Sequence, residues 1–321
     1  MSEYLLRLEG VNLSSVLEDT NQLSVIRGGS LLLRQSIYDI ADHFSKLEPI
    51  SSGASAGLFR LQADAQEAEQ VRDDIAAYLN CDPHYCHLTF VVDIQPAGEE
   101  FILDSEAVLA RNRFRQLQQP TLALPPYNEK TDVAPCDWDG LRPGTVQLEV
   151  MRDGNRPWVS TSVQQRHNYG RDQKQRFYRR ETAEPTLASL RFTNDLHDLS
   201  ENSPFRNLDG KLAIIYLDGN GFTKLRETYC HTAEALRKFD SCVQDYRRQF
   251  LTAFLQHIKD DPHFKTDAGV LRLETLLWGG DELILVVPAW KGLQTLHAFY
   301  AQSEHWKFEG EPRLLNLTVF S

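Results

Sequence analysis

Short apolar runs and one long stretch with apolar residues every three or four positions alternate in the last third of the chain. Continuous apolar runs predict buried strands, and the three-to-four spacing predicts amphipathic helices. In order, the predicted elements are a strand at 212–217, a helix within 224–258, strands at 271–278 and 283–287, a helix at 289–303 and a strand at 314–320. This β-α-β-β-α-β order is typical of a ferredoxin-like fold, which pairs its first and third strands at the centre of one sheet.

The first hundred residues repeat that order. The predicted elements are a strand at 4–11, a helix at 31–44, a hairpin remnant at 54–61, a helix at 64–79 and a strand at 87–94. We therefore expect an α+β protein with two ferredoxin-like domains, 1–97 and 210–321. The segment 98–209 joins them as a connector, with a helix at 99–117 and a loop-rich stretch of Pro, Gly and Asp after it. The alternative is two unrelated α+β domains that share a common element order.

Composition excludes several classes of protein. With 321 residues and 41% hydrophobic residues, the chain is long enough for two cores of its own. No run of about eighteen apolar residues and no leader-like N-terminus occur, so we expect a cytoplasmic protein without a membrane segment. Five scattered cysteines without a CxxC pair indicate reduced thiols rather than a disulfide framework or a zinc site.

The charge is uneven along the chain. A net charge of -11 disfavours a whole-protein electrostatic grip on nucleic acid. The segment Arg166–Arg180 is the one basic island, with six cationic side chains and one acid, and with Tyr169, Phe177 and Tyr178 among them. It is a candidate contact for RNA, triphosphate or protein. The alternative is an ordinary solvated helix face.

Two acidic strand ends carry the chemistry. The strand 212–217 runs into Asp218-Gly219-Asn220-Gly221-Phe222, and the hairpin carries Gly279-Gly280-Asp281-Glu282 at its tip. The predicted pairing brings Asp218 next to Asp281 and Glu282, which are the three predicted catalytic residues. With the carbonyl of Gly219, these carboxylates offer the hard oxygen ligands that Mg²⁺ or Mn²⁺ takes for phosphoryl transfer. Taken singly, each motif is also compatible with an ordinary turn.

The glycines fit a nucleotide site. Gly279 and Gly280 allow positive φ and a close approach of a nucleotide to the backbone, while Gly219 and Gly221 open the exit of the strand. The predicted nucleotide-binding residues in this domain are Gly219, Asn220, Gly221, Phe222, Gly279 and Gly280. In the N-terminal domain, Gly28, Gly29 and Ser30 form a further candidate phosphate cradle through backbone N–H groups, with a helix N-cap as the alternative for Ser30.

The N-terminal copy lacks the acidic hairpin. Aligning the first strands sets Glu9-Gly10-Val11-Asn12 against residues 218–221, while the hairpin counterpart Ile50–Gly57 contains no acid. This copy is therefore expected to be structural or supporting.

Residues 217–222 and 279–282 resemble the palm domain shared by GGDEF diguanylate cyclases and the large polymerase-like subunit of type III CRISPR effectors. Residues 19–30 are similar to the segment that opens the first palm of the CRISPR subunit, which carries two palms. The resemblance implies metal-dependent synthesis of a cyclic oligonucleotide, most often an oligoadenylate, from nucleoside triphosphates, with ATP favoured, in antiviral defence or signalling. The CRISPR subunit usually has two aspartates at the hairpin, whereas here Glu282 is the second acid.

Other functions fit the same residues. A non-catalytic palm could bind RNA or a cyclic nucleotide and relay the signal to a partner. A class III-like mononucleotide cyclase also has Gly-Phe-Thr after its first acid, as at 221–223. The chain could act as a complex subunit or as a homo-oligomer.

Overall fold

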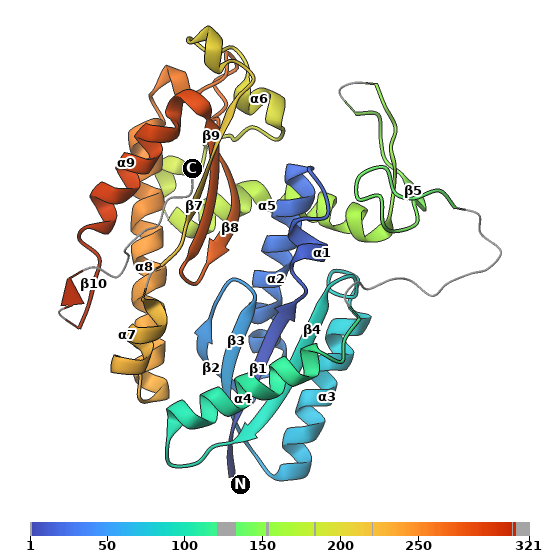
Figure 1. Cartoon of the computed structure of the whole chain (residues 1–321), viewed down its shortest axis with the longest axis vertical. Coiled ribbons are helices and arrows are strands. Elements are labelled where there is room, and N and C mark those ends of the chain that lie inside the picture. The colour runs from blue at the N-terminus through green and yellow to red at the C-terminus, as the bar shows by residue number, and fades with distance from the viewer. Residues whose placement is uncertain are drawn as a thin grey trace. The chain divides into compact units, whose positions relative to one another are not determined.

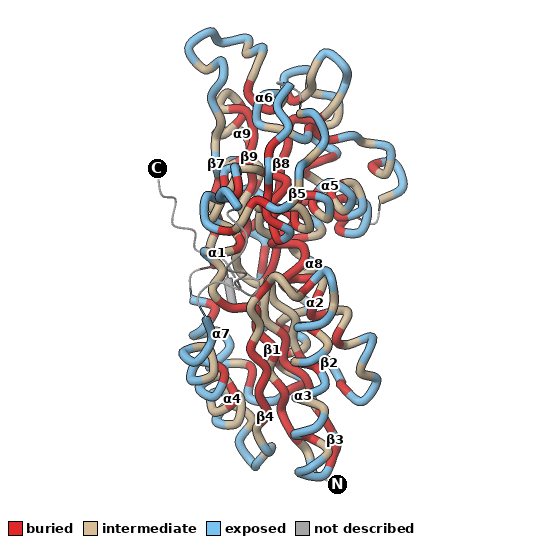
Figure 2. Tube along the Cα trace, turned by 90° about the vertical axis from the view of Figure 1, so that its right-hand side faces the viewer, coloured by how far each residue is buried: buried red, intermediate tan, exposed pale blue. Residues whose placement is uncertain are grey.

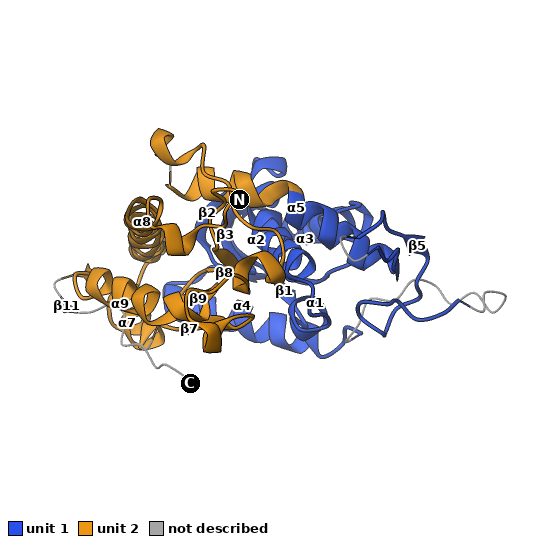
Figure 3. Ribbon diagram, turned by 90° about the horizontal axis from the view of Figure 1, so that it is seen from above, with its two compact units in different colours: residues 1–171 blue, residues 172–321 orange. Residues whose placement is uncertain are grey.

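The chain forms two compact units, Met1–Arg171 and Asp172–Ser321, in a computed structural model (Figure 3). The structure describes residues 2–120, 133–151, 154–182, 184–219, 221–309 and 311–312, the last two by their backbone alone. The division falls inside helix α5 (Thr161–Thr182). The connector expected at 98–209 is thus divided between the two units, and each sheet lies wholly within one unit.

The first unit contains a four-stranded antiparallel sheet of order β2-β3-β1-β4 (Figure 1). Its elements are β1 (Ser2–Val11), α1 (Ser14–Leu17), α2 (Leu23–His43), β2 (Leu47–Ser52), β3 (Ala56–Ala63), α3 (Ala65–Cys81), β4 (Thr89–Pro96), α4 (Phe101–Gln116), β5 (Val146–Gln147) and β6 (Trp158–Val159). This order confirms the ferredoxin-like prediction for the N-terminal domain. The strand at 4–11, the helix at 64–79 and the helix at 99–117 are each found within a few residues of the predicted bounds.

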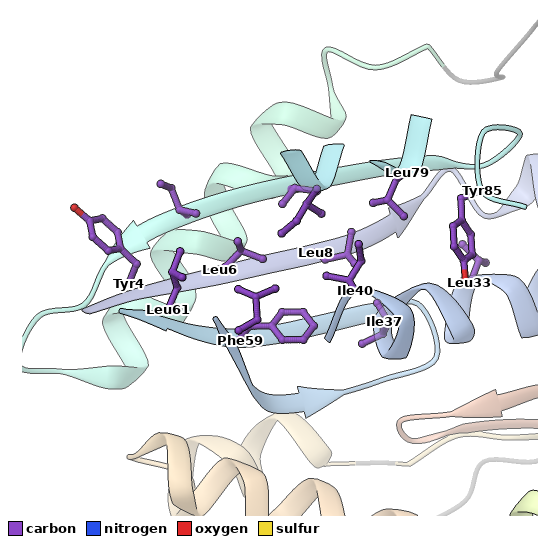
Figure 4. Packing of buried hydrophobic residues seen from close by; sticks show 14 of the residues in the cluster. Tyr4, Leu6, Leu8, Leu33, Ile37, Ile40, Phe59, Leu61, Leu79 and Tyr85 are labelled. Carbon is purple, nitrogen blue, oxygen red and sulfur yellow. The ribbon is translucent and has the colours of Figure 1, made fainter. Parts of the chain in front are cut away.

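One face of this sheet packs on α2 and α3. Alternate residues of β1, among them Leu6 and Leu8, point into a cluster with Ile37 and Ile40 of α2 and Leu79 of α3 (Figure 4). All five side chains are at most 2% exposed, so this layer is the core of the unit (Figure 2). Because side chains alternate between the two faces of a strand, the other residues of β1 face away from it.

Helix α4 covers the opposite face of the sheet, beside β1 and β4 (Figure 1). Asn112 is buried there and donates from Nδ2 to the carbonyl of Arg7 at 3.3 Å. Arg113 contacts Glu9 at 2.8 Å, and Arg115 contacts Asp93 at 2.8 Å. These polar contacts fix which side of α4 faces the sheet.

Helix α2 begins at Leu23, eight residues before the predicted start at 31, and crosses the first half of α5 at very close range. A Cβ added to Gly28 would lie 1.8 Å from the carbonyl oxygen of Arg166, and one added to Gly170 would lie 2.0 Å from that of Ser24. Arg27 donates from Nε to the carbonyl of Gly170 at 2.8 Å. Glycine is required at this crossing because two backbones meet there.

This position corrects the prediction of a phosphate cradle at Gly28, Gly29 and Ser30. The three residues are buried in the second turn of a 21-residue helix, where backbone N–H groups bond to carbonyls four residues earlier. A phosphate needs N–H groups that lack such partners. The N-cap is Gln22, so Ser30 does not cap the helix either.

The same helix crossing buries His167. Its Nδ1 lies 2.7 Å from Oγ of Ser24, and its ring meets Trp138 edge-on at 5.2 Å. Burial lowers the pKa of His167 to about 4, and the charges of Arg171 and Arg27 act in the same direction. The imidazole is therefore neutral in the folded protein near pH 7.

The pKa of His167 predicts how stability depends on pH. An unfolded histidine has a pKa of about 6.5, so the unfolded chain takes up a proton first as pH falls. The free energy of unfolding falls as the pH drops from about 6.5 to about 4, by on the order of 3 kcal/mol in total. Urea unfolding at a series of pH values should show this loss, and His167→Gln should flatten it. His84→Gln, at an exposed position, serves as the control, and an equal slope in the His167 variant would contradict the assignment.

The second unit contains a three-stranded antiparallel sheet of order β7-β9-β8. Its elements are the second half of α5, α6 (Leu196–Ser200), β7 (Leu212–Leu217), α7 (Phe222–Tyr229), α8 (Ala233–Ile258), β8 (Glu274–Gly279), β9 (Glu282–Pro288), α9 (Gly292–Ser303), β10 (Lys307–Phe308) and β11 (Glu311–Pro312), with 3₁₀ turns at Pro185–Leu187, Arg206–Leu208, Pro262–Phe264 and Ala289–Lys291. The first and third strands of the predicted order, β7 and β9, are paired as predicted, with β9 between β7 and β8. The closing strand predicted at 314–320 lies outside the described residues.

The long helix predicted within 224–258 is two helices, because a new N-terminus forms at Thr232. The hydroxyl of Thr232 accepts a hydrogen bond from the N–H of Ala235 at 3.2 Å and caps α8. Apolar side chains of α8 such as Phe239, Phe250 and Phe254 are buried. None of the helices in the described ranges is long and apolar enough to cross a membrane.

Candidate functional site

The end of β7 and the tip of the β8-β9 hairpin lie side by side in the second unit. The ladder between the strands continues to the pair Leu217 and Leu283, and the N–H of Gly219 then donates to the carbonyl of Asp281 at 3.1 Å. This hydrogen bond joins the two acidic motifs directly. The prediction that strand order makes Asp218 a neighbour of Asp281 and Glu282 is confirmed.

The hairpin tip is a two-residue connection. Gly279 and Glu282 form the last pair of the ladder, which leaves Gly280 and Asp281 as the central residues. Gly280 has φ of 54°, the positive value that a type II′ turn requires at its first central residue. Asp281 therefore sits at the tip, and Glu282 is the first residue of β9.

Gly219 has no room for a side chain. A Cβ at this position would lie 2.5 Å from the Phe222 ring and 2.7 Å from the Cβ of Asp281. Phe222 is buried at the start of α7, where it meets Phe239 of α8. The glycine thus lets the chain pass between an anchored ring and the acidic hairpin, and it sets the separation of the two acids.

The acids influence one another. Burial raises the pKa of the Asp281 carboxyl, and the charge of Asp218 contributes to that rise. The backbone N–H of Asp281 and the cations Arg226 and Arg247 act in the opposite direction. Two like charges held this close repel each other, and a bound cation would relieve that repulsion.

Glu282 has a protein partner. The hydroxyl of Tyr216 on β7 donates to its Oε1 at 2.7 Å. Burial raises the pKa of the Tyr216 phenol, and the bond to Glu282 raises it further. The hydroxyl therefore remains a donor at neutral pH and orients the carboxylate.

Arg247 of α8 also holds the hairpin, and sequence reasoning missed it. Its Nη1 donates to the carbonyl of Gly280 at 2.9 Å, and its guanidinium lies 5.9 Å from the centre of the Trp278 ring. The side chain is 3% exposed. Arg247 follows Val243 by four positions on the apolar face of α8, and a cation in that place is the signal that could have revealed it.

The three acids do not already form a metal cage. Among the residues that the structure describes, no three His, Cys, Asp or Glu side chains form a group that could hold a metal ion. Asp218 lies close enough to Asp281 for its charge to raise the pKa of that carboxyl, while Glu282 accepts a hydrogen bond from Tyr216. Asn220, which was predicted to bind nucleotide, lies outside the described residues. Gly221 has φ of 85° and forms the N-cap of α7.

The first unit contains the same main-chain arrangement without the two acids of the hairpin. The N–H of Gly10 donates to the carbonyl of Ser55 at 2.7 Å, and Glu9 is paired with Ala56 across the sheet. The pair Gly10 and Ser55 corresponds to Gly219 and Asp281 in the second unit. The pair Glu9 and Ala56 corresponds to Asp218 and Glu282. Ser55 and Ala56 replace the acids, and Glu9 is bound by Arg7 and Arg113. The hairpin of the first copy therefore presents no acid, as expected, and Glu9 alone corresponds to one of the three acids.

The basic island at Arg166–Arg180 is only partly a surface. Lys174 is buried and bonds to Glu274 at 2.8 Å, and Arg166 is buried and bonds to Asp19 at 2.7 Å. Phe177 and Tyr178 are also buried, so they cannot stack on bases. The exposed cations of the segment are Arg171, Arg176, Arg179 and Arg180.

Solved structures share this architecture. A crystal structure of Csm1 in T. onnurineus matches with a TM-score of 0.55 and 11% sequence identity, over 94% of this chain and 46% of that chain. The chain has the fold of Csm1. A Csm1-Csm4 cassette in complex with AMPPNP matches with a TM-score of 0.57 and 11% identity, over 94% of this chain and 48% of that chain. A Csm1-Csm4 cassette in complex with cA4 matches with a TM-score of 0.53 and 11% identity, over 94% of this chain and 48% of that chain.

The chain spans about half the length of the Csm1 chains that it matches. The match confirms, for the fold, the resemblance to the large subunit of type III CRISPR effectors. No protein-family model and no curated protein matches this chain.

Proposed function

We propose that this chain is a metal-dependent nucleotidyltransferase that joins nucleoside triphosphates, with ATP favoured, into a cyclic oligoadenylate in antiviral defence or signalling. The observation that carries the proposal is the main-chain bond from Gly219 to Asp281, which places Asp218 beside the acidic hairpin. The Csm1 fold supports it, since Csm1-Csm4 cassettes are described with AMPPNP, ATP and oligoadenylates bound.

The donor set fits Mg²⁺ or Mn²⁺. Asp218 and Asp281 offer carboxylate oxygens at one place, Glu282 can add another, and the carbonyl of Gly219 lies beside them. When bound, the ion would neutralise phosphate charge and make a 3′-hydroxyl easier to deprotonate.

The side chains around the acids have positioning roles in this proposal. Tyr216 orients Glu282, and Arg247 fixes the tip through Gly280. In the reaction a ribose hydroxyl oxygen bonds to the α-phosphorus of a second triphosphate, and the bond to pyrophosphate breaks. The hydroxyl proton passes to water, and pyrophosphate leaves.

The test is direct. The protein is incubated with each nucleoside triphosphate and Mg²⁺ or Mn²⁺, and the products are identified by mass spectrometry. We expect an oligoadenylate from ATP and a loss of at least about 1,000-fold in rate for Asp281→Ala combined with Glu282→Ala. The control, Asp73→Ala with Asp74→Ala, removes the same charge from an exposed stretch of α3.

Other outcomes separate the alternatives. No product from any nucleotide, or the same product from the double variant, contradicts the proposal. Tight binding of RNA or a cyclic nucleotide in calorimetry without turnover would indicate a binding module. A cyclic mononucleotide formed at a concentration-dependent specific rate would indicate a class III-like cyclase.

A further inference from the structure

Helix α4 of the first unit exposes an apolar stripe. Leu103, Phe114 and Leu117 are 61%, 66% and 85% exposed, and Ala107 and Ala110 fall between them. The five positions follow a spacing of four, three, four and three residues, which is the seam of a helix that pairs with another helix.

The stripe cannot turn inwards. Val108 and Asn112 of the same helix are fully buried against the sheet, and Asn112 donates to the carbonyl of Arg7. The face with Leu103 and Phe114 lies on the other side of α4 and is exposed. Large apolar side chains gathered on one exposed face are typical of an interaction surface.

Charges beside the stripe indicate the partner. Asp104 and Glu106 flank its first half, and Arg111 and Arg113 flank its second half. A second α4 that runs antiparallel sets the acidic half of each helix against the basic half of the other. The surface is therefore complementary to itself.

We propose that this protein forms a two-fold dimer in which α4 packs antiparallel on α4 of a second copy. In the matching register Leu103 meets Phe114 of the partner subunit, and Ala107 meets the partner's Ala110. The small alanines lie at the centre and let the helices approach closely.

The same register aligns the charges. Glu106 faces the partner's Arg113, and Asp104 faces the partner's Arg111, each twice by symmetry. Arg113 already contacts Glu9 of its own chain at 2.8 Å, so the partner's Glu106 adds a second carboxylate. A parallel pair would match only Glu106 with Arg111, because positions 99 and 118, which would face Asp104 and Arg113, lie outside the helix.

A single helix of this length forms a small interface. Sixteen residues span roughly 24 Å, which is less than a standard protein interface covers. We therefore expect a dimer that dissociates in the micromolar range.

Sedimentation velocity over a concentration series tests the dimer without any nucleotide, so its result is independent of the proposed enzyme activity. We expect Phe114→Glu to weaken the dimer by at least about tenfold. The matched control is Leu293→Glu on α9, which replaces an apolar side chain that is 85% exposed and should have no effect on self-association. A wild-type protein that stays monomeric to about 200 µM, or a dimer that Phe114→Glu leaves intact, would overturn the proposal.

A charge exchange tests the orientation. Glu106→Arg alone and Arg113→Glu alone should each weaken self-association, because like charges then face each other. An equimolar mixture of the two variants should restore the dimer. A mixture that stays monomeric would exclude the antiparallel register. Circular dichroism confirms that Arg113→Glu, which also loses the contact to Glu9, is folded.

Discussion

Replacing Gly219 with alanine is expected to reduce oligoadenylate formation by about 100-fold or more while the protein stays folded. The added methyl group would lie 2.5 Å from the ring of Phe222 and 2.7 Å from the Cβ of Asp281. Phe222 is anchored in the core, so the hairpin must move away and carry Asp281 from Asp218. This prediction rests on the proposed activity and is measured as the single-turnover rate with ATP and metal.

Gly98→Ala is the matched control for Gly219→Ala. Its added Cβ would meet Asp104 at an ordinary distance of 3.4 Å, in the first unit. We expect wild-type turnover and an unchanged thermal midpoint from this variant, whereas Gly219→Ala should lower the midpoint and still be folded at the assay temperature. If Gly219→Ala turns over normally, the spacing of the two acids does not govern the reaction.

The second large effect concerns stability. Gly28→Ala is expected to destabilise the first unit by about 3 kcal/mol or more, because its methyl group would lie 1.8 Å from the carbonyl oxygen of Arg166. Neither backbone can yield without separating α2 from α5 and breaking the bond from Arg27 to Gly170. Urea unfolding followed by circular dichroism measures this change.

Gly53→Ala makes the same chemical change where the nearest atom, the carbonyl oxygen of Ala56, is 3.4 Å away. It should shift the unfolding midpoint by only a small fraction of the Gly28→Ala effect. Equal midpoints for wild type and Gly28→Ala would show that the crossing is not tight in solution.

The sequence predicts much of the fold because its apolar runs are unambiguous. The strand at 212–217 is found with the predicted bounds, since a run of six apolar residues with Gly210 before it and Asp218-Gly219 after it is typical of a short strand. Helix α2 was predicted to start too late because Gly28 and Gly29 suggest a loop when considered locally. The contact with α5, some 140 residues later in the chain, explains Gly28, and the close approach of Val16 of α1 explains Gly29.

The candidate site also has a part that the sequence predicts and a part that it does not. The proximity of Asp218 and Asp281 follows from strand order, which the periodicity predicts. The roles of Arg247 and Tyr216 could not be predicted in this way. Arg247 reaches the hairpin from helix α8, and Tyr216 reaches Glu282 only because of the direction of its side chain; local sequence determines neither contact. The burial of Lys174 was missed for a similar reason, because its partner Glu274 is 100 residues away.

The shared hydrogen bond of the two copies has an evolutionary consequence. Gly10 and Gly219 each donate to a carbonyl at the hairpin, of Ser55 in one copy and of Asp281 in the other. Every residue has the same main-chain carbonyl, whatever its side chain. The hydrogen bond that the fold needs can therefore be kept while the side chain at the hairpin changes with the chemistry. An acidic centre can thus be lost or regained by substitutions at two adjacent codons, while the scaffold that presents it is inherited unchanged.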